Sequence, residues 1–555
     1  MIKHKLKIGL LIDSYIVPSW VFDMVDMIKK SNHSEIALIV LKKETPKPTK
    51  NSFLKNLWKK RSVILFEIYN KIDKKIFKPS PYVFTPKNLK NNINCSEIIV
   101  TPKVINHNDC ITEADINQIK TYNIDVFIKL GFNNLVGDIF NASKFGIWAY
   151  HHADYNLKRA NHLTGAWEVF EDWDETKAVV LKLSEDLEDC IKLHEAFFST
   201  DHVSIKRNMN MLYKNSVSIL PRKLDELFQI GEKEFFQKLK KQKTEPLFYY
   251  NRDFKAPSNL EFIKVFYANW KKAIKGMISR KFYLSQWIIL FNLNSTETIS
   301  KSFYKFKRIL PPKDSFWADP FVFEKNDKYY IFIEEYVNKE QKGKISVIEM
   351  DQNGNYSQPT VVLEKDYHLS YPFLIEEGGE LYMMPETEEN RTIELYKCVE
   401  FPTKWEFKKV LINDIMAVDA TILKHNDKFW LFTNVKEYKG INLINELMLF
   451  YTDNLLEGNW KSHPQNPIAI DHRHSRPAGN IFKLNDRIFR PGQDCSKHYG
   501  YGIQLMEIMT LNENDYEERY IQSIYPNWDN DVRSVHTLNY SGKLTVIDAI
   551  VKRRR

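Results

Sequence analysis

Two histidines and an aspartate follow an apolar run in the first third of the chain. Residues 146–154 read GIWAYHHAD, so His151, His152 and Asp154 come where a buried strand would end. Imidazole titrates near neutral pH, and a neighbouring carboxylate can orient it and move protons, as general acid and base catalysis requires. A histidine at the end of a strand more often serves as a structural hydrogen-bonding group. The pattern predicts a candidate catalytic site and leaves the structural role open.

Three carboxylates in the second half of the chain are a second candidate for acid and base chemistry. Asp319, Glu386 and Asp419 stand beside apolar strands of similar sequence. Glycoside chemistry needs one carboxylic acid that stays protonated and another that stays ionised, and three carboxylates around one centre can supply both. Each aspartate taken alone is more simply explained as a residue that caps a strand or turn.

The elements around His151 have the order of a parallel α/β sheet. Helices are predicted between buried strands, and the strands are expected at 6–12, 36–41, 97–103 and 125–132. Such alternation is typical of βαβ units. GIWAY is then an inner strand, and its histidines lie at the carboxyl end, where open α/β sheets bind ligands.

The second half contains five similar segments, each with a polar position, an apolar strand, a turn with Asn, Asp or Gly, and a second apolar strand. The polar positions are Asp319, Tyr371, Asp419, Ala478 and His536, with spacings of 52, 48, 59 and 58 residues. This period fits four-stranded blades and predicts a five-bladed β-propeller. A strand from near residue 285 or 303 is expected to complete the last blade, because such closure protects sheet edges.

Polar and aromatic side chains at the repeated positions should converge on the central channel of the propeller. Aromatic rings offer faces on which a sugar stacks, and polar groups fix its orientation, so we expect a carbohydrate site there. The candidate residues are Trp317, Asp319, Glu334, Tyr371, Glu386, Asp419, Arg476, Arg490, Gln493, Asp494 and His536.

The expected architecture is an α/β domain and an all-β propeller joined by a helical connector. The α/β domain covers 1–220 with an insertion at 43–93, the charged helical connector covers 221–300, and the propeller covers 301–555. A length of 555 residues suits two or three domains.

Charge is uneven along the chain. Residues 1–100 carry 19 Lys and Arg against 8 Asp and Glu, while the whole chain has a net charge of +9. The excess favours an anionic partner such as a membrane face or a nucleotide sugar, although a solvated lysine surface explains it equally well. A basic amphipathic helix within 52–78 is a candidate for peripheral membrane contact, against the simpler prediction that it packs on its own domain.

Other classes are disfavoured. The five cysteines are scattered and include no CxxC motif, so we expect reduced thiols in a cytoplasmic protein and neither disulfides nor a metal site. Neither a signal peptide nor a transmembrane span is expected. The basic region lacks the interleaved aromatic residues of single-strand nucleic-acid-binding proteins, so nucleic acid is not an expected partner.

The first 220 residues resemble the N-terminal domain of the folate-dependent formyltransferases. The resemblance rests on IDVFIKLGF, on FGIWAYHHADYNLKRANHLTGAWEVFEDW and on TKAVVLKLSEDLEDCIKL. It implies a Rossmann-type fold, 10-formyltetrahydrofolate as cofactor, and a catalytic histidine at His151. The asparagine of the family pattern falls on Ala149, and the aspartate of the family's LDxG turn falls on Glu188. Losing one oxyanion donor typically lowers a rate about 10²- to 10³-fold, so ordinary formyl transfer is in doubt.

The second half resembles two related groups. WADPF and AVDATI are similar to the first and middle blades of family 43 glycoside hydrolases. The longer run that includes YPFLIEEGGELYMMPE, RPGQDCSKHYGYGI and HTLN is closer to the N-terminal region of plant glucosamine inositolphosphorylceramide transferases. The resemblance implies that Asp319 is a base, Asp419 a modulating carboxylate and Glu386 an acid.

Three functions are compatible with these observations. The first is a carbohydrate-modifying transferase of surface-polysaccharide biosynthesis, with formyl or acyl transfer to an amino sugar at His151, His152, Asp154 and Glu188 while the propeller holds a carbohydrate or nucleotide-sugar substrate. The second moves glycosyl transfer or hydrolysis into the propeller, with a degenerate formyltransferase domain. The third is glycan recognition without catalysis. The expected location is cytoplasmic, with membrane association open.

Overall fold

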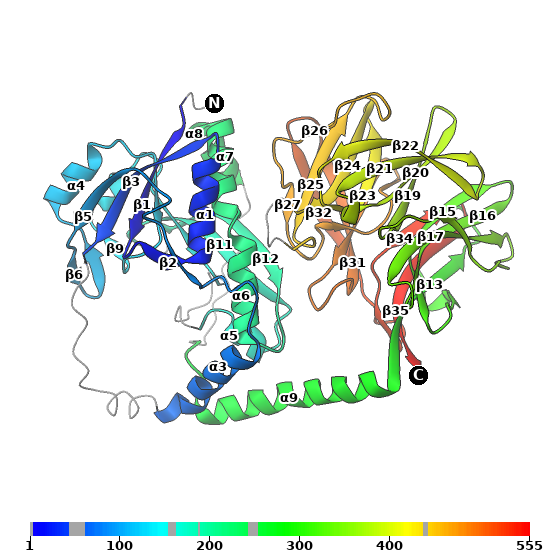
Figure 1. The fold of residues 1–555 in the computed structure, drawn as a ribbon, viewed down its shortest axis with the longest axis horizontal. Coiled ribbons are helices and arrows are strands. Elements are labelled where there is room, and N and C mark those ends of the chain that lie inside the picture. Colours follow the sequence, from blue (N-terminus) through cyan, green and yellow to red (C-terminus); the bar gives the residue numbers. More distant parts are fainter. Residues whose placement is uncertain (1–3, 44–60, 154–162, 187–188, 242–253, 437–441) are drawn as a thin grey trace. The chain divides into compact units, whose positions relative to one another are not determined.

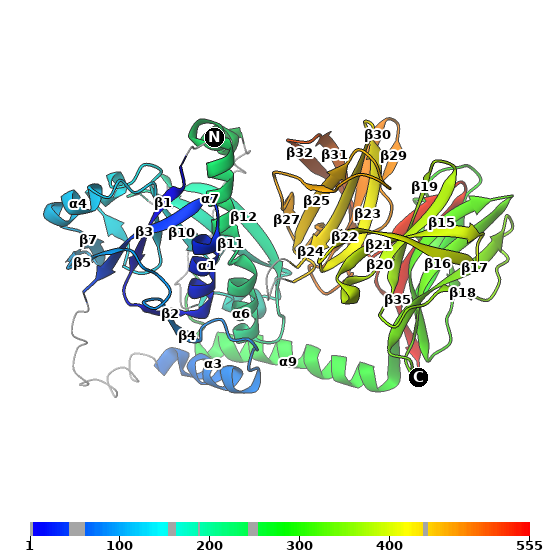
Figure 2. The same cartoon turned by 45° about the horizontal axis from the view of Figure 1, so that its top comes forward.

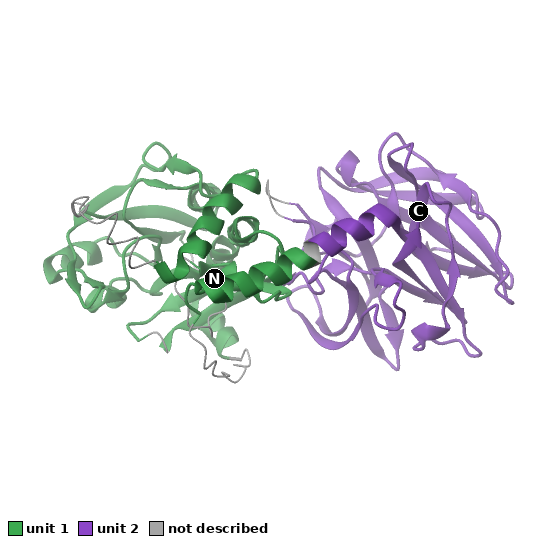
Figure 3. Ribbon diagram, turned by 90° about the horizontal axis from the view of Figure 1, so that it is seen from below, with its two compact units in different colours: residues 1–272 green, residues 273–555 purple. Residues whose placement is uncertain are grey.

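The computed structural model describes residues 4–43, 61–153, 163–186, 189–241, 254–436 and 442–555. The chain separates into two compact units, Met1–Lys272 and Ala273–Arg555, coloured separately in Figure 3. Each unit is described by itself below. The boundaries predicted at 220 and 300 stay predictions. Among the described residues, no helix has the length and apolar character needed to cross a membrane.

The first unit is built on a seven-stranded sheet in which five neighbouring strands are parallel. From one edge to the other the order is β12-β11-β10-β8-β1-β3-β5, and β11 is antiparallel to both of its neighbours, β10 and β12. The parallel strands are almost continuous apolar runs, as strands covered on both faces must be. In chain order the strands are β1 (Leu6–Ile12), β3 (Ser34–Lys42), β5 (Ser96–Val100), β8 (Val126–Lys129), β10 (Ile147–His151), β11 (Glu175–Leu183) and β12 (Ile191–Ser199).

Helices pack on this sheet through apolar faces with a helical period. The helix α1 (Ser19–Lys30) buries Val21, Met24, Val25 and Ile28, which recur at intervals of three or four residues. In chain order the other long helices of this unit are α3 (Ile64–Ile76), α4 (Glu113–Lys120), α6 (Ile205–Ser216), α7 (Ile219–Ile230) and α8 (Glu232–Lys241), with the short α5 (Ala166–Phe170) before β11. Figure 1 shows α1 and α7 beside the sheet.

Smaller elements complete this unit. The strand β2 (Ile16–Pro18) pairs with β4 (Pro86–Asn88), and β7 (Asn108–Cys110) joins β6 (Lys103–Ile105) to β9 (Leu135–Val136). The helix α9 (Asn259–Phe282) starts in this unit. The side chain of Asn259 accepts a hydrogen bond from the backbone N–H of Leu65 in α3 and donates one to the carbonyl oxygen of Arg61, which precedes α3. Of the basic segment expected as a helix at 52–78, residues 52–60 lie outside the described residues.

The second unit consists of five antiparallel sheets that follow one another along the chain as the blades of a propeller (Figure 2). Blade 1 is β15 (Ser315–Lys325), β16 (Lys328–Val337), β17 (Lys342–Asp351) and β18 (Thr360–Leu363); blade 2 is β19 (Ser370–Glu377), β20 (Glu380–Glu386), β21 (Thr392–Glu400) and β22 (Lys404–Asn413); blade 3 is β23 (Ala417–His425), β24 (Lys428–Val435), β25 (Glu446–Thr452), β26 (Lys461–Ser462) and β27 (Ala469–Ile470). Blade 4 is β28 (Arg476–Pro477), β29 (Phe482–Leu484), β30 (Arg487–Asp494), β31 (Gly502–Leu511) and β32 (Tyr516–Ile524).

Blade 5 closes the ring with strands from both ends of the unit. The strand β13 (Tyr283–Leu293) pairs along its whole length with the last strand, β35 (Leu544–Arg554), and β14 (Lys307–Ile309), β33 (Val532–Ser534) and β34 (Leu538–Ser541) complete the sheet. The expected closure by a strand near residue 285 or 303 is therefore present. Pairing of the first and last strands leaves neither of them as a free edge.

Candidate functional site

The innermost strands of the first three blades carry the same backbone irregularity. Register shifts follow Ala318, Ser370 and Val418, and the next residue in each blade has a left-handed backbone: φ is 50° at Asp319, 45° at Tyr371 and 51° at Asp419. Left-handed φ is uncommon for residues other than glycine, and for a tyrosine it is strained. These bulges turn the three side chains toward the other blades.

Tight hairpin turns bring a second set of side chains to the same place. Asn-Asp pairs with positive φ join the first two strands in blades 1 and 3, and Asn485-Asp486 does so in blade 4, as two-residue hairpins favour. With the register fixed by such turns, the seventh residue of the strand that follows the turn occupies one position in four blades: β16, β20, β24 and β30. These residues are Glu334, Glu386, Asn434 and Gln493. Together with the bulge residues they form what we call the hub.

One part of the hub joins blade 1 to blade 5. Asp319 accepts a hydrogen bond of 2.8 Å from the Thr537 hydroxyl, and its backbone N–H donates to Oδ2 of Asp548 at 2.9 Å. Nδ1 of His536 lies 2.6 Å from Oδ2 of Asp548, and Nε2 lies 3.7 Å from Oδ1 of Asp319. The imidazole of His536 therefore lies between two buried carboxylates.

The other part of the hub joins blades 2, 3 and 4. Arg476 donates to Asp419 through Nε at 2.5 Å and through Nη2 at 3.2 Å, and Gln493 donates to Oδ2 of Asp419 at 2.8 Å. Glu386 accepts a 3.1 Å hydrogen bond from the backbone N–H of Asp419 and lies 3.9 Å from Nη2 of Arg476. The hydroxyl of Tyr371 accepts from the backbone N–H of Gly479 at 2.8 Å and so connects blade 2 to blade 4.

The surroundings of the carboxyl groups shift their pKa values to different extents. Burial, together with the nearby Asp419 and Asp548, raises the pKa of Asp319 to about 6 against the opposing effect of His536. Burial and Asp319 raise the pKa of Glu334 well above its usual range, and burial and Asp419 do the same for Glu386. Burial alone would lower the pKa of His536, but Asp548 and Asp319 outweigh it and raise that pKa. Near neutral pH the hub thus holds neutral acids beside ionised ones.

Solvent reaches the hub at a few side chains. The side chains of Glu386 and Arg476 are 13% and 12% exposed, while Asp419 and Gln493 are almost fully buried. Tyr499 is 44% exposed and covers the Arg476 guanidinium, whose carbon lies 5.0 Å from the ring centroid. The same ring meets His536 edge-on at 5.6 Å, and Trp287 stacks on His536 at 4.1 Å. An exposed aromatic ring therefore adjoins Arg476, whose Nη2 lies 3.9 Å from Glu386.

Three residues expected at the channel lie elsewhere in the second unit. Trp317 is 3% exposed and belongs to a hydrophobic core with Ile289 and Ile331, so it offers no face to a sugar. Arg490 pairs with Glu518, with Nη2 2.7 Å from Oε1, and Asp494 accepts hydrogen bonds from Gln504 and Tyr525. Arg490 and Asp494 are each an odd number of residues from Gln493, so the strand directs them to the opposite face.

The trio Asp319, His536 and Asp548 has a geometry compatible with a bound cation. Their ligand atoms all lie within 4.8 Å of one another. A metal ion needs a neutral imidazole, however, whereas two flanking carboxylates favour the protonated form of His536. The ion-paired imidazolium is the simpler state of this trio.

In the first unit the structure separates the two adjacent histidines. His151 is the last residue of β10, at the carboxyl edge of the sheet, and is partly exposed. His152 is buried, stacks on Tyr213 at 3.7 Å and contacts Ser216 Oγ through Nε2 at 3.1 Å. Burial and the neighbouring His151 lower the pKa of His152 to about 3, so it stays neutral. Asp154 and Glu188, the predicted carboxylate partners, lie outside the described residues.

Sequence reasoning missed four residues of the hub region. Asp548 and Thr537 belong to blade 5, and their place beside Asp319 follows only from ring closure. Tyr499 lies in DCSKHYGYGI, where two tyrosines close to two glycines could have indicated an exposed aromatic loop. Trp287 lies in β13, the strand that closes the ring.

Comparison with known proteins gives a match over most of the propeller. Residues 310–536 match the family model described as glucosamine inositolphosphorylceramide transferase 1, N-terminal, which confirms the resemblance of the second half. The transferase of this name from Oryza sativa subsp. japonica is 34% identical over 207 residues, covering 37% of this chain and 28% of that protein. The one from Arabidopsis thaliana is 33% identical over 207 residues, covering 37% and 27%. The chain thus spans less than a third of the length of these relatives.

Similar solved structures are glycoside hydrolases with low sequence identity. Zg3597, a family 117 glycoside hydrolase produced by Zobellia galactanivorans, has a TM-score of 0.32 and 11% identity, covering 48% of this chain and 90% of that chain. A thermostable family-43 glycoside hydrolase has a TM-score of 0.34 and 12% identity, covering 47% and 92%. TM-scores and sequence identities this low do not assign an activity to the chain. The segment that carries Asp319, Glu386 and Asp419 is, by sequence, similar to the N-terminal region of the glucosamine inositolphosphorylceramide transferases.

Proposed function

We propose that the chain is a carbohydrate-modifying transferase whose propeller hub binds an amino sugar and transfers a sugar group by acid and base catalysis. The observation that carries the proposal is the divided protonation of the hub carboxyl groups beside the exposed ring of Tyr499. The sugar ring stacks on Tyr499, as sugars do on aromatic faces. Arg476 lies against that ring, and Glu386 lies 3.9 Å from Arg476; both side chains are partly exposed.

The roles of the carboxyl groups follow from their pKa values. Glu386, whose pKa is raised well above its usual range, donates a proton to the phosphate oxygen of the leaving nucleotide. The bond from the sugar carbon to that oxygen breaks as the oxygen of the incoming hydroxyl forms a bond to the same carbon. Asp319, with a pKa of about 6, is ionised above that pH and accepts the proton of the incoming hydroxyl. Asp419 stays paired with Arg476 and holds Glu386 in place through its backbone N–H.

The substrate class is taken from the relatives. They are named for glucosamine and for inositolphosphorylceramide, and this chain shares only a segment with them. We therefore infer an amino sugar as the donor group and an inositol phosphate lipid as the acceptor.

The test is transfer of sugar from nucleotide-activated glucosamine or N-acetylglucosamine to an inositol phosphate lipid, followed by mass spectrometry. Glu386→Gln should lower the rate about 10²- to 10⁴-fold, the usual contribution of a general acid. Glu376→Gln, an exposed glutamate of the same blade, should leave the rate unchanged. The rate should also rise as the pH passes about 6, where Asp319 ionises.

Sugar binding without catalysis can be distinguished from transfer by measuring affinity and product separately. Tyr499→Ala should weaken binding of the amino sugar, measured by calorimetry, while Tyr499→Phe should keep the stacking and the affinity. If both Glu386→Gln and wild type bind sugar and neither transfers it to any acceptor, the hub is a recognition site and the catalytic part of the proposal is wrong.

A second candidate function is formyl or acyl transfer at His151. The observation that favours it is the position of His151 at the carboxyl end of the parallel strand β10, next to the antiparallel pair β11 and β12. In this case 10-formyltetrahydrofolate donates the formyl group to an amino sugar. His151→Ala should then abolish the N-formyl product and His152→Phe should spare it. Absence of folate binding by the wild-type protein would exclude this candidate.

A further inference from the structure

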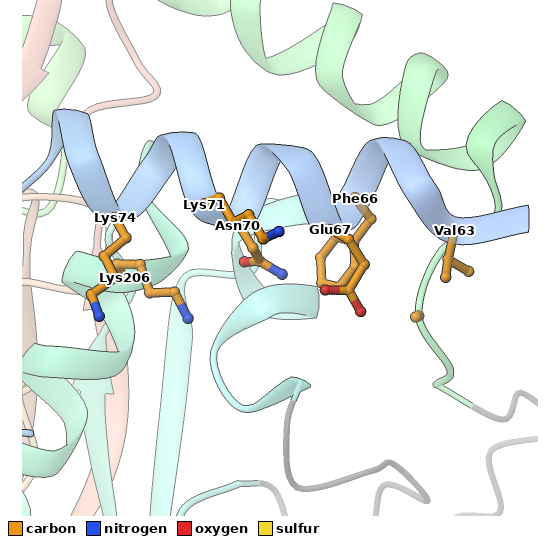
Figure 4. A pocket seen from close by; sticks show the side chains of 8 residues that line it. Val63, Phe66, Glu67, Asn70, Lys71, Lys74 and Lys206 are labelled. Atoms are coloured by element: carbon orange, nitrogen blue, oxygen red, sulfur yellow. The ribbon is translucent and has the colours of Figure 1, made fainter. Parts of the chain in front are cut away.

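A cavity of about 570 Å³ lies beside α3 in the first unit, far in sequence from the hub. Its apolar wall is formed by Val63, Phe66 and Ala256. Its polar wall consists of three lysines, one glutamate and one asparagine: Lys71, Lys74, Lys206, Glu67 and Asn70. Figure 4 shows the side chains of α3 leaving one side of the helix, with the ammonium groups of Lys74 and Lys206 next to each other and pointing the same way. The cavity therefore combines an apolar surface with clustered positive charge.

The three lysines of this cavity form no short ion pair with a described carboxylate, and Lys206 interacts with Asp73 and Glu67 only at longer range. In the part of the chain that the structure describes, no carboxylate oxygen lies within 4.0 Å of the ammonium group of Lys71, Lys74 or Lys206. Elsewhere in the unit such contacts are common, for example Lys42 with Asp109 at 2.5 Å. Burial and the nearby Lys74 lower the pKa of Lys206 against the opposing charge of Asp73. Unpaired cations at one place are a feature that a bound anion would stabilise.

An unsatisfied amide lies among these lysines. Oδ1 of Asn70, which also lines the cavity, is buried and has no hydrogen-bond partner. Buried polar atoms in folded proteins almost always have one, so this atom points to a ligand. Oδ1 can accept from a hydroxyl, and a half-turn of the amide presents Nδ2 to an anion instead.

The cavity wall itself is partly apolar. Val63, Phe66 and Ala256 line it beside the lysines and Asn70. A hydrocarbon chain can cover these side chains while a charged group meets the lysines. A small hydrophilic anion would leave the apolar wall in water.

We propose that this cavity binds the phosphate of an amphiphile, with the lysines and Asn70 on the phosphate group and the hydrocarbon chain along Val63, Phe66 and Ala256. This site is independent of the sugar chemistry at the hub. The amphiphile is either a phospholipid of a membrane surface or a soluble organic phosphate with an alkyl chain.

The experiment uses the full chain and calorimetric titration with octyl phosphate below its critical micelle concentration. Lys71→Gln/Lys74→Gln should weaken binding at least about tenfold, because each lysine near a phosphate contributes roughly 1 kcal/mol. Both side chains are exposed, so the change should leave the fold intact. The matched control is Lys233→Gln/Lys240→Gln on α8, which removes two exposed lysines of the same unit and should change the affinity less than about twofold.

Further experiments distinguish a membrane lipid from a soluble phosphate and define the results that would contradict the proposal. A membrane lipid is identified if the protein floats with phosphatidylcholine vesicles that contain phosphatidate and if flotation is lost in Lys71→Gln/Lys74→Gln. A soluble amphiphile is identified if the protein binds octyl phosphate but does not float with these vesicles. Inorganic phosphate should bind more weakly than octyl phosphate. The proposal is overturned by a wild type that does not bind octyl phosphate, by equal losses in the two double variants, or by equal affinity for inorganic phosphate.

Discussion

Replacing Asp319 by asparagine should stabilise the propeller at neutral pH. Burial raises the pKa of Asp319 from its ordinary 3.8 to about 6. Between these values the folded state binds more protons than the unfolded state, so the free energy of unfolding falls as the pH rises and the loss is complete above pH 6. At 1.36 kcal/mol per pKa unit the loss is about 3 kcal/mol. Asparagine keeps the shape, an oxygen that accepts from Thr537, and tolerance of the left-handed backbone, but it does not ionise.

The assay is urea unfolding at a series of pH values from 4 to 8, followed by hydrogen exchange of propeller peptides because the two units can unfold separately. The difference in unfolding free energy between Asp319→Asn and wild type should be small below pH 4 and grow by about 3 kcal/mol by pH 7. The control is Asp327→Asn in the same blade, an exposed turn residue with a similar φ of 55°. A pH profile of Asp319→Asn that matches the control, or a loss of stability at pH 7, would refute the reasoning.

Three further predictions concern single contacts. Arg490→Met should lower the unfolding free energy by about 1.5–3 kcal/mol, because buried Glu518 loses the hydrogen bonds from Arg490 and keeps only His474 as a cationic partner. Arg490→Met/Glu518→Gln should recover part of this loss in urea unfolding. Tyr371→Phe should cost about 1–3 kcal/mol in the same assay, since the buried N–H of Gly479 loses its acceptor. His152→Phe should cost no more than about 1.5 kcal/mol and leave any activity intact, because His152 is a neutral ring in an aromatic cluster.

Local patterns were sufficient to predict the strands and their turns. Asn-Asp pairs between apolar runs predict two-residue hairpins, and the structure has such turns at Asn326-Asp327 and Asn426-Asp427 with positive φ. The turn Gly378-Gly379 plays the same part in blade 2, and Glu386 and Asp419 are at the hub as expected from their spacing. The parallel order of the first sheet follows in the same way from alternating strands and helices.

Side-chain direction and ring closure could not be predicted from local patterns. Gln493 is three positions after Arg490 in β30, and side chains an odd number of positions apart in a strand point to opposite faces, so the two residues make different contacts. Asp548 lies in an ordinary apolar strand, and its contact with Asp319 requires that blade 5 lie beside blade 1. Burial of Trp317 likewise depends on packing between blades.

The hub is hard to explain as a purely structural feature. Buried ion pairs are often no more stabilising than well-packed apolar residues, and left-handed φ at Asp319, Tyr371 and Asp419 costs roughly 1 kcal/mol or more at each position. A propeller needs neither, because its blades already pack through apolar cores such as that of Phe321 and Phe373. Strained backbone and costly ionisable groups coincide at this one place. Features that lower stability at a single site are expected where a protein binds or acts on a ligand, and this coincidence is the reason to look for the sugar chemistry in the hub first.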